Sequence, residues 1–295
     1  MTSKSFSPGP AFDPDAVLAL SRHPGLAAAM RTSAEQVIAL YQSSRLLNWL
    51  MDDRARVLFS YFALHLHYSR DPDDPSSGLT PTRMKAMCAD LNVCSPGRVV
   101  AMMQLLRFRD YLAPDPDVTD RRQHRLIATE KFIEFSRDRW RPHFAAMAPL
   151  FADGTDVLAF VDDPASTRPL IAAMERQFRA GFRLIIHAPE MSVFASRNGA
   201  MPILANLIAA GEGDDTVPPS RPVPVSISAL ARRFSVSRPH VLKLLRDAAG
   251  DGLIERTGRD GDHIVIRPLL AEATRKFFAT LYLFFNGCAR EARGG

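Results

Sequence analysis

Hydrogen-bond donors cluster at the start of one segment with helical periodicity in the last third of the chain. Ser237, Arg238 and His240 lie within four residues, and Lys243 follows at the next helical turn. In the first turn of a helix such donors can enter a DNA major groove, where Arg238 suits a bidentate contact to guanine and Lys243 a guanine or a phosphate. Basic residues nearby suit phosphates, whose contacts position a protein on DNA without reading its sequence; they are Arg232, Arg233, Arg246 and Arg259.

A less polar set of the same kind occurs in the first half of the chain. Ser95, Arg98 and Gln104 follow a similar helical spacing, and the last two could read base edges. A basic cluster further along suits phosphates or a narrow minor groove; its members are Arg121, Arg122 and Arg125. We expect this set to bind DNA as well, and the alternative is that it binds weakly or not at all.

The elements around Ser237 follow from the spacing of apolar residues. Apolar side chains recur at helical intervals in 227–234 and again in 238–248. Ser237 stands between the two and is placed to cap the second helix, with a proline in its first turn. Two strand-like runs, 253–257 and 263–267, are separated by a turn rich in Gly and Asp. Helix, short turn, helix and β-hairpin are the parts of a winged helix-turn-helix.

The first half of the chain repeats this pattern. Four apolar positions of the second predicted helix recur at one constant offset in the numbering, and so does the triplet that follows the helix. The preceding helices align at an offset larger by one, because the first turn carries one extra residue. The chance alternative is a pair of unrelated amphipathic helices. The matched positions are Val99, Met102, Met103 and Leu106 with Val241, Leu244, Leu245 and Ala248, followed by 110–112 with 252–254.

The flanks of the two segments repeat too. Each half is expected to begin with a long amphipathic helix, to continue with a second helix, and to close with a helix after the hairpin. The closing helix of the second half contains an apolar run, 277–285, that must be covered on more than one side. The expected helices are 34–51, 54–68 and 129–142 in the first half, and 169–187, 200–210 and 268–288 in the second.

This order of elements resembles the MarR-type winged helix-turn-helix transcriptional regulators, over about 250 residues and as two copies in one chain. The segment 226–241 is the part most similar to bacterial helix-turn-helix sequences. The resemblance implies a mainly α fold with small β-wings (α+β), in which two copies pair through their terminal helices and place two recognition helices on DNA. Because the copies are fused here, we expect a tandem winged helix-turn-helix that forms an intramolecular pseudo-dimer, either monomeric or paired again as a homodimer.

The resemblance also implies a small apolar or aromatic effector, bound between the pairing helices and the winged domain. Bulky and partly polar side chains of the first half are candidates for lining such a pocket, and ordinary core packing is the alternative for each of them. These candidates are Trp49, Tyr61, Phe62, His65 and Trp140.

Length and composition are those of a soluble globular chain with about two domains, since 46% of its 295 residues are apolar and 23% are charged. The expected parts are an N-terminal arm with a short helix (1–33), a first MarR-like winged-helix half (34–150), a linker (151–168) and a second MarR-like half (169–295).

Charge is segregated along the chain, whose net charge is +5. Segments 79–125 and 221–267 carry +3 and +4, whereas the rest of the chain holds 20 basic and 22 acidic side chains. Solvated surfaces usually mix the two signs, so this segregation favours a phosphate-binding surface. It counts against a module that binds only other proteins.

No other chemistry stands out. The histidines and cysteines lack the spacing of a metal finger, so we predict no metal and no cofactor. No glycine-rich phosphate loop, nucleophile elbow or catalytic arrangement of paired carboxylates stands out, and we therefore predict that the chain is not an enzyme. An odd number of cysteines, three, indicates a reducing cytoplasm. No segment reaches the roughly 18 apolar residues of a membrane span, and the N-terminus lacks a secretory signal.

The sequence therefore predicts a cytoplasmic, nucleoid-located transcriptional regulator that binds double-stranded DNA in a sequence-specific manner. Its two recognition helices are not identical, which predicts an asymmetric site. Two alternatives remain open: a replication initiator or nucleoid-associated DNA-binding factor, and a tandem winged-helix module for protein–protein interaction.

Overall fold

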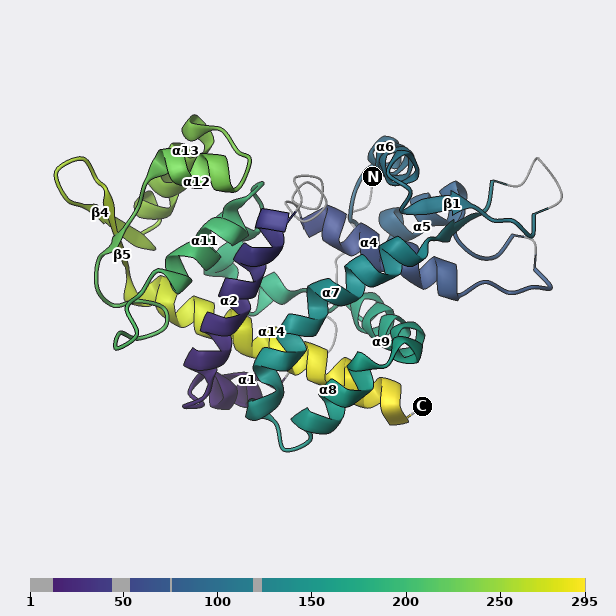
Figure 1. Cartoon of the computed structure of the whole chain (residues 1–295), viewed down its shortest axis with the longest axis horizontal. Helices are drawn as coiled ribbons and strands as arrows, with labels where there is room; N and C mark the ends of the chain where they lie inside the picture. The colour runs from purple at the N-terminus through teal and green to yellow at the C-terminus, as the bar shows by residue number, and fades with distance from the viewer. Residues whose placement is uncertain (1–12, 44–53, 75, 119–123, 295) are drawn as a thin grey trace, which may run out of the picture.

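The structure is a computed structural model that describes residues 13–43, 54–74, 76–118 and 124–294. The part of the chain that it describes is mainly helical, with two small antiparallel sheets. Figure 1 shows a central body of helices and two smaller units that project toward opposite ends of the long axis. The helices of the body are α1 (Pro14–Ser21), α2 (Leu26–Ser43), α4 (Arg54–Tyr68), α7 (Glu130–Met147), α8 (Gly154–Asp162), α9 (Thr167–Arg179), α10 (Ser192–Ala195), α11 (Ala200–Ala209) and α14 (Pro268–Gly294).

Each projecting unit consists of two helices followed by a β-hairpin. In the first unit, residues 79–128, strands β1 and β2 pair antiparallel and Leu79 adds an isolated bridge. In the second unit, residues 223–267, a third strand completes a sheet of order β3-β5-β4. The elements are α5 (Pro81–Asp90), α6 (Pro96–Phe108), β1 (Leu112–Pro114) and β2 (Leu126–Ala128), then β3 (Val223–Pro224), α12 (Ile227–Arg233), α13 (Arg238–Gly250), β4 (Ile254–Thr257) and β5 (His263–Ile266).

The two units share the same backbone geometry at their turns. Asn92 and Ser235 end the first helix of each unit in the left-handed region, with φ of 51° and 54°. Asp110 and Gly252 end the second helix in the same way, with φ of 60° and 70°. At all four turns the next amide donates to the carbonyl five residues earlier, at 2.8–3.1 Å, which is the Schellman arrangement of a helix end. The left-handed residues of the two copies are therefore separated by the same two offsets as the apolar positions of the sequence repeat.

Strand register extends the equivalence to the closing helices. The first residue of β1 pairs with Ala128, and the first residue of β4 pairs with Ile266, so these two positions are equivalent. The first hairpin is four residues longer than the second, which shortens the offset between the copies by the same amount. At this shorter offset in α7 and α14, the hydroxyls of Ser136 and Thr274 each donate to the carbonyl four residues earlier, at 2.8 and 2.7 Å. We therefore compare α7 with α14 in the register that aligns Ser136 with Thr274.

In each half of the chain, one long helix packs against a helix of the other half. Helix α2 packs on α7 and on α11 of the second half, and the corresponding helix α9 packs on α14 and on α4 of the first half. The units dock across the halves as well. The ring of Tyr41 meets that of Phe234, at the end of α12, edge-on with centroids 6.0 Å apart. Arg183, just after α9, donates to the Leu91 carbonyl at the end of α5 (3.2 Å). Each unit thus rests on a helical segment of the other half.

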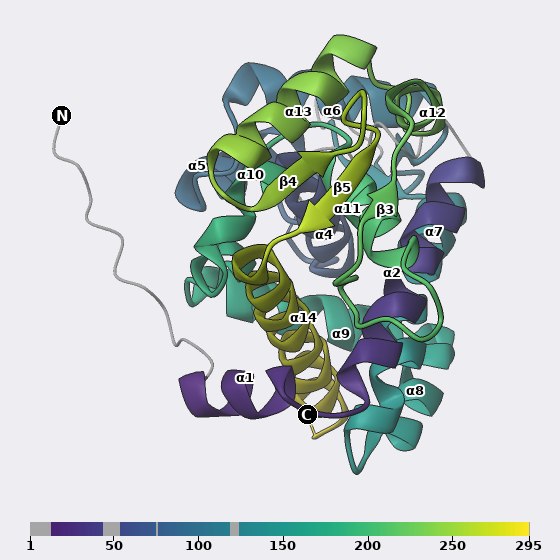
Figure 2. The ribbon, with the colours of Figure 1, turned by 90° about the vertical axis from the view of Figure 1, so that its left-hand side faces the viewer.

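Helix α14 runs through the centre of the body, as Figures 1 and 2 show. Helices α1, α2, α7, α8 and α9 all pack against it. Its aromatic side chains are buried, and Phe284 stacks on Phe182 with centroids 4.5 Å apart. The expectation that the apolar run 277–285 is covered on more than one side is confirmed. None of the described helices combines the length and apolar content that a membrane span requires.

Two expected boundaries of the long helices were wrong. Helix α2 begins at Leu26 rather than at 34, because the break in the chain lies at Pro24 and Gly25. The expected part from 44 to 51 lies outside the described residues. Helix α9 ends at Arg179 rather than at 187, because Gly181 takes a φ of 98° that a right-handed helix cannot continue.

The closing helices are longer than expected, and the expected linker is folded. Helix α7 continues through Pro142 to Met147, and α14 continues to Gly294. Segment 151–168 contains α8, which packs on α7 and α14. Short 3₁₀ turns join the body helices in the described part of the chain: η1 (Ala148–Leu150), η2 (Pro164–Ser166), η3 (Leu184–Ile186) and η4 (Pro189–Met191).

Candidate nucleic-acid interface

Helices α6 and α13 lie on the same face of the molecule, at the top of both Figure 1 and Figure 2. The serine before each helix caps it: Ser95 Oγ accepts from the Arg98 amide (3.4 Å) and Ser237 Oγ from the His240 amide (3.2 Å). The predicted cap at Ser237 is therefore confirmed. The apolar face of each helix is buried within its unit, which leaves the opposite face in solvent.

The second unit presents most of the predicted basic side chains to solvent. Arg238 in the first turn of α13, Arg246 further along it and Arg232 on α12 are exposed, and none of the three has a polar partner among the described residues. Arg259 lies at the exposed tip of the hairpin between β4 and β5. These side chains are available to an anionic partner.

Other predicted residues of this unit already have partners. The Lys243 ammonium pairs with the Asp247 carboxylate (3.1 Å), and Arg233 donates to the Asn206 side-chain oxygen (2.6 Å). Both basic side chains remain exposed, so these weak surface contacts can be exchanged for phosphate contacts.

The segment that precedes α11 holds α13 in place, a feature that sequence reasoning missed. The ring Nε2 of His240 lies 2.8 Å from the Asn198 carbonyl. Arg197 pairs with Asp247 at 2.5 Å. Gly199 has a φ of 67° and passes so close to α13's preceding turn that an added Cβ would lie 2.9 Å from Val236. His240 is thus half-buried and contributes to positioning of the helix. The sign of this contact in the sequence is the glycine directly before α11, Gly199.

The first unit presents fewer cations. Ser95 and Gln104 are exposed, whereas Arg98 is half-buried. Arg121 and Arg122 lie outside the described residues. The structure corrects the role of Arg125, which is only 7% exposed and pairs with Asp115 at 2.7 Å. Arg125 is part of a structural ion pair at the loop end of β1 and β2 and is not available to a phosphate.

Asp115 is the centre of this buried pair. Its carboxylate is fully buried, and Arg70 approaches it to 3.5 Å from the end of α4. Burial alone would raise the pKa of Asp115, but the Asp117 amide, Arg125 and Arg70 outweigh it and the pKa is lowered. The hairpin of the first unit is therefore tied to the helical body through a charged contact.

One exposed apolar side chain was also missed. Phe108 ends α6 and is 77% exposed, with the Arg109 guanidinium 5.7 Å from its ring centre. It lies off the buried stripe of α6, so the helical period marks it as outward-facing. It adds an apolar contact to the face that carries α6.

The candidate effector residues divide into two groups. Tyr61 and Trp140 line a cavity of about 180 Å³ in the helical body and stack with ring centroids 5.9 Å apart. Phe62 packs edge-on against Phe178 in the core, and His65 contacts the Ser69 hydroxyl; neither lines this cavity. Trp49 lies outside the described residues.

Comparisons with protein-family models, with curated proteins and with solved structures find no match to this chain. Within the described residues, no three His, Cys, Asp or Glu side chains gather as a metal site would require. Function is therefore inferred from the geometry and chemistry of the chain itself.

Proposed function

We propose that the chain is a tandem winged-helix protein that binds double-stranded DNA and regulates transcription. In this proposal α6 and α13 are the two recognition helices and the two hairpins are the wings. The observation that carries it is the repeat of helix, turn, helix and hairpin with matched left-handed turns, which leaves the polar faces of α6 and α13 in solvent on one side of the molecule. Two helices exposed on one face can contact one duplex together.

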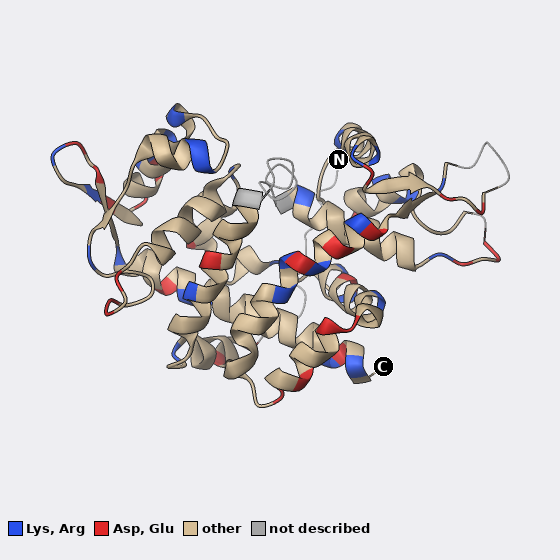
Figure 3. Cartoon of the chain, in the orientation of Figure 1, with Lys and Arg blue, Asp and Glu red and all other residues tan. Residues whose placement is uncertain are grey.

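The distribution of charge supports DNA as the partner. Figure 3 shows Lys and Arg on α12, α13 and α6, the elements that form the proposed DNA-binding face. Segments 79–125 and 221–267 together hold a charge of +7, against −2 for the rest of the chain. A helical body that is slightly acidic directs the phosphate backbone toward the two units.

The exchange of helices between halves supports an intramolecular pseudo-dimer. In a protein of two separate subunits, the pairings of α2 with α11 and of α9 with α4 would be subunit contacts. Here one chain makes both, so one molecule can present two recognition helices without an association step.

The two helices carry different side chains, so the proposed target is asymmetric. In the register that aligns Val99 with Val241, Arg238 and Lys243 of α13 correspond to Pro96 and Ala101 of α6. A helix without these cations cannot make the same contacts to guanine. We expect two unlike half-sites about one helical turn apart.

Selection of binding sites from random duplex DNA tests this proposal. Wild-type protein should enrich one asymmetric sequence, and Arg238→Ala should lower affinity for it by about 10- to 100-fold. Arg168→Ala is the matched control, because Arg168 is exposed on α9 outside both units. A perfect inverted repeat with equal footprints on both arms would contradict the asymmetric site, and affinity that does not depend on salt would contradict DNA binding itself.

Genome-wide mapping of bound DNA with the same variant pair distinguishes the role. Binding at discrete promoter-proximal sites supports a transcriptional regulator. Binding confined to a replication origin, or spread along the chromosome, favours the initiator or nucleoid-associated alternative. If the protein occupies no specific DNA site but still binds partner proteins, the result favours an interaction module.

A further inference from the structure

Arg183 is a buried cation at the junction between the second half of the chain and the first projecting unit. It follows the end of α9 and is only 9% exposed. Its Nη1 donates to the carbonyls of Phe178 (2.8 Å) and Phe182 (2.7 Å), and its Nη2 donates to the Leu91 carbonyl (3.2 Å). One nitrogen therefore serves the end of α9, and the other serves the end of α5 in the first unit.

The guanidinium lies between the carbonyl ends of two helices. Leu91 is the C-cap of α5, and Phe178 lies in the last turn of α9. The carbonyl end of a helix carries the negative end of its dipole, which favours a cation there. Leu91 is only 6% exposed, so little water can replace the arginine. Because the guanidinium is planar and its donors are fixed relative to one another, it holds the two helix ends in a defined geometry.

The anchored carbonyl belongs to the turn that leads into α6. Leu91 is followed directly by the left-handed Asn92, and Ser95, the cap of α6, comes three residues later. A displacement at Leu91 is therefore passed to α6 through a short and tightly turned segment. Arg183 thus holds the point from which the first proposed recognition helix projects.

The equivalent contact in the other half has a different chemistry. Leu91 corresponds to Phe234 in the register of the first helices of the two units, and Phe234 is the C-cap of α12. Helix α2 meets Phe234 through the ring of Tyr41, edge-on with centroids 6.0 Å apart. Such ring pairs occur over a range of about 4.5–7 Å, whereas an N–H···O hydrogen bond requires about 2.7–3.2 Å. The contact made by Arg183 therefore defines the position of its unit more sharply.

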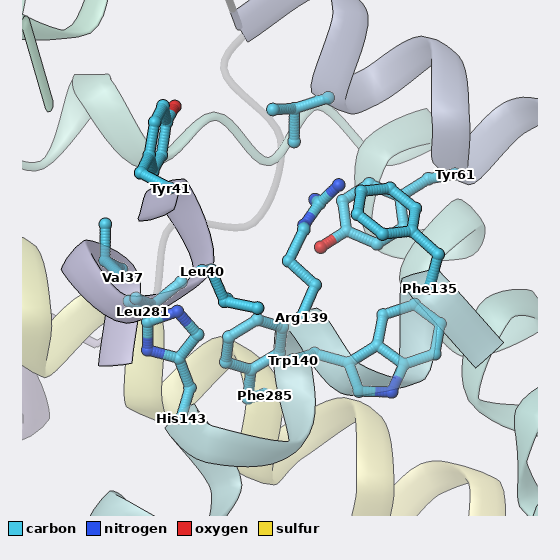
Figure 4. Close-up of a pocket in the computed structure, with 11 residues that line it drawn as sticks. Val37, Leu40, Tyr41, Tyr61, Phe135, Arg139, Trp140, His143, Leu281 and Phe285 are labelled. Carbon is cyan, nitrogen blue, oxygen red and sulfur yellow. The ribbon is translucent and has the colours of Figure 1, made fainter. Parts of the chain in front are cut away.

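The other strongly buried arginines of the described residues contact partners of the first half. Arg125 closes the hairpin of the first unit. Arg139 is 7% exposed and extends from α7 toward Tyr61, as Figure 4 shows, with its guanidinium 5.0 Å from the ring centre. Burial and the neighbouring Arg139 lower the pKa of His143 to about 4, so Arg139 acts on its own helix as well. Within this described set, the hydrogen bond between the halves is made by Arg183.

We propose that Arg183 is a positioning residue, which fixes α6 relative to α13 and thereby sets the half-site spacing that the protein accepts. The distance between two recognition helices determines the spacing of the half-sites that they can reach together. The effect on the distance between the helices concerns the protein alone. The effect on half-site spacing rests on the proposed function.

Distances between two spin labels measure the first effect without DNA. Gln104→Cys on α6 and Arg246→Cys on α13 place the labels at exposed positions that correspond in the repeat. The native cysteines are removed from this background by Cys88→Ala, Cys94→Ser and Cys288→Ala. Double electron–electron resonance should give a narrow distance distribution for the otherwise unchanged protein.

Substitution of Arg183 should broaden or shift this distribution. Arg183→Gln removes the charge, and Arg183→Lys keeps it. Both should have the effect, because a lysine has a single nitrogen and cannot serve α9 and α5 at once. Arg179→Gln is the matched control and should leave the distribution unchanged, since Arg179 is exposed on α9 and pairs with Glu175 of the same helix.

Duplexes with altered spacing measure the second effect. Two base pairs inserted between the half-sites of the selected sequence separate them by about 7 Å more and rotate one by about 70° about the DNA axis. The protein with Arg183 intact should lose at least about 10-fold in affinity, because one recognition helix no longer reaches its bases. Arg183→Gln and Arg183→Lys should lose most of this ratio, whereas Arg179→Gln should keep it.

Two results would overturn the proposal. The first is an unchanged distance distribution in either folded variant of Arg183. The second is an equal loss of affinity at both spacings, which a purely structural role would produce. Thermal melting establishes that the variants are folded, and Arg183→Lys carries the test if Arg183→Gln does not fold. If the wild-type protein binds no specific DNA, the proposed function is contradicted, and the distance distributions alone decide the role of Arg183.

Discussion

The two projecting units have the same turns and helix caps but keep their hairpins in place by different means. In the first unit a buried ion pair, Asp115 with Arg125, closes the loop end of a two-stranded hairpin. In the second unit a third strand, β3, completes the sheet, and the ion pair at its base, Arg267 with Glu255, is exposed. Local backbone geometry has thus been retained between the copies, while the ion pairs of the wings and the charges on the outward faces have diverged.

The largest expected effect separates these two ion pairs of the wings. Asp115→Ala removes the carboxylate and leaves Arg125 buried without its partner, which should lower the free energy of unfolding by about 3–5 kcal/mol. Glu255→Ala breaks an exposed pair and should lower it by less than about 1 kcal/mol. Urea denaturation of both variants measures the difference. Similar losses for the two variants would show that the two wings are held in the same way.

The second effect is the pH dependence of stability due to His143 on α7, which corresponds to Leu281 on α14. The pKa of His143 is about 4 in the folded chain and 6.5 in its ordinary state. Since the folded pKa is lowered, the stabilisation is complete above pH 6.5 and is lost as the pH falls toward 4. The loss should approach about 3 kcal/mol, at about 1.36 kcal/mol per pKa unit.

His143→Leu, which places the residue of the second half in the first, isolates this contribution. Burial also lowers the pKa values of His65, His67 and His187, so the wild-type protein has a larger total pH dependence. The difference between wild type and His143→Leu, measured by urea denaturation from about pH 7 down to about pH 4.5, removes their share. Parallel stability profiles would contradict the lowered pKa of His143.

A third, smaller effect compares the two proposed recognition helices. Arg238→Ala on α13 should weaken binding to the selected DNA site by about 1–3 kcal/mol and relax specificity in one half-site. Gln104→Ala on α6 removes an exposed but uncharged side chain and should cost less. Fluorescence anisotropy with each half-site mutated in turn measures both. A larger loss for Gln104→Ala would assign the dominant contacts to the first unit.

The features that could be predicted from the sequence are those set by neighbouring residues. The serine caps, the left-handed turns and the apolar stripes of α6 and α13 all depend on residues within a few positions, so the offsets of the sequence repeat carried through to the structure. The start of α2 could have been predicted in the same way, since Pro24 and Gly25 interrupt the helical pattern directly before Leu26.

Contacts between distant segments could not be predicted in this way. Arg125 was grouped with Arg121 and Arg122 as a basic cluster, because nothing in its spacing reveals that Asp115 and Arg70 meet it inside the unit. The burial of Arg139 could not be predicted from the sequence either, since an arginine on an amphipathic helix is normally solvated. Its burial follows from the packing of α2, α4 and α14 around α7, which joins both halves of the chain.

The smallest expected effect separates the tip of a wing from its recognition helix. Arg259 is exposed at the tip of the second hairpin, where it suits a phosphate contact that carries no sequence information. Arg259→Ala should weaken binding to all duplexes alike and should reduce the slope of log affinity against log salt by about 1. Titrations between low and high salt, with the selected site and with a scrambled duplex, measure this slope. Because Arg238→Ala should instead weaken the selected site alone, a sequence-selective loss in Arg259→Ala would place a base contact in the wing and assign to α13 a smaller share of the readout.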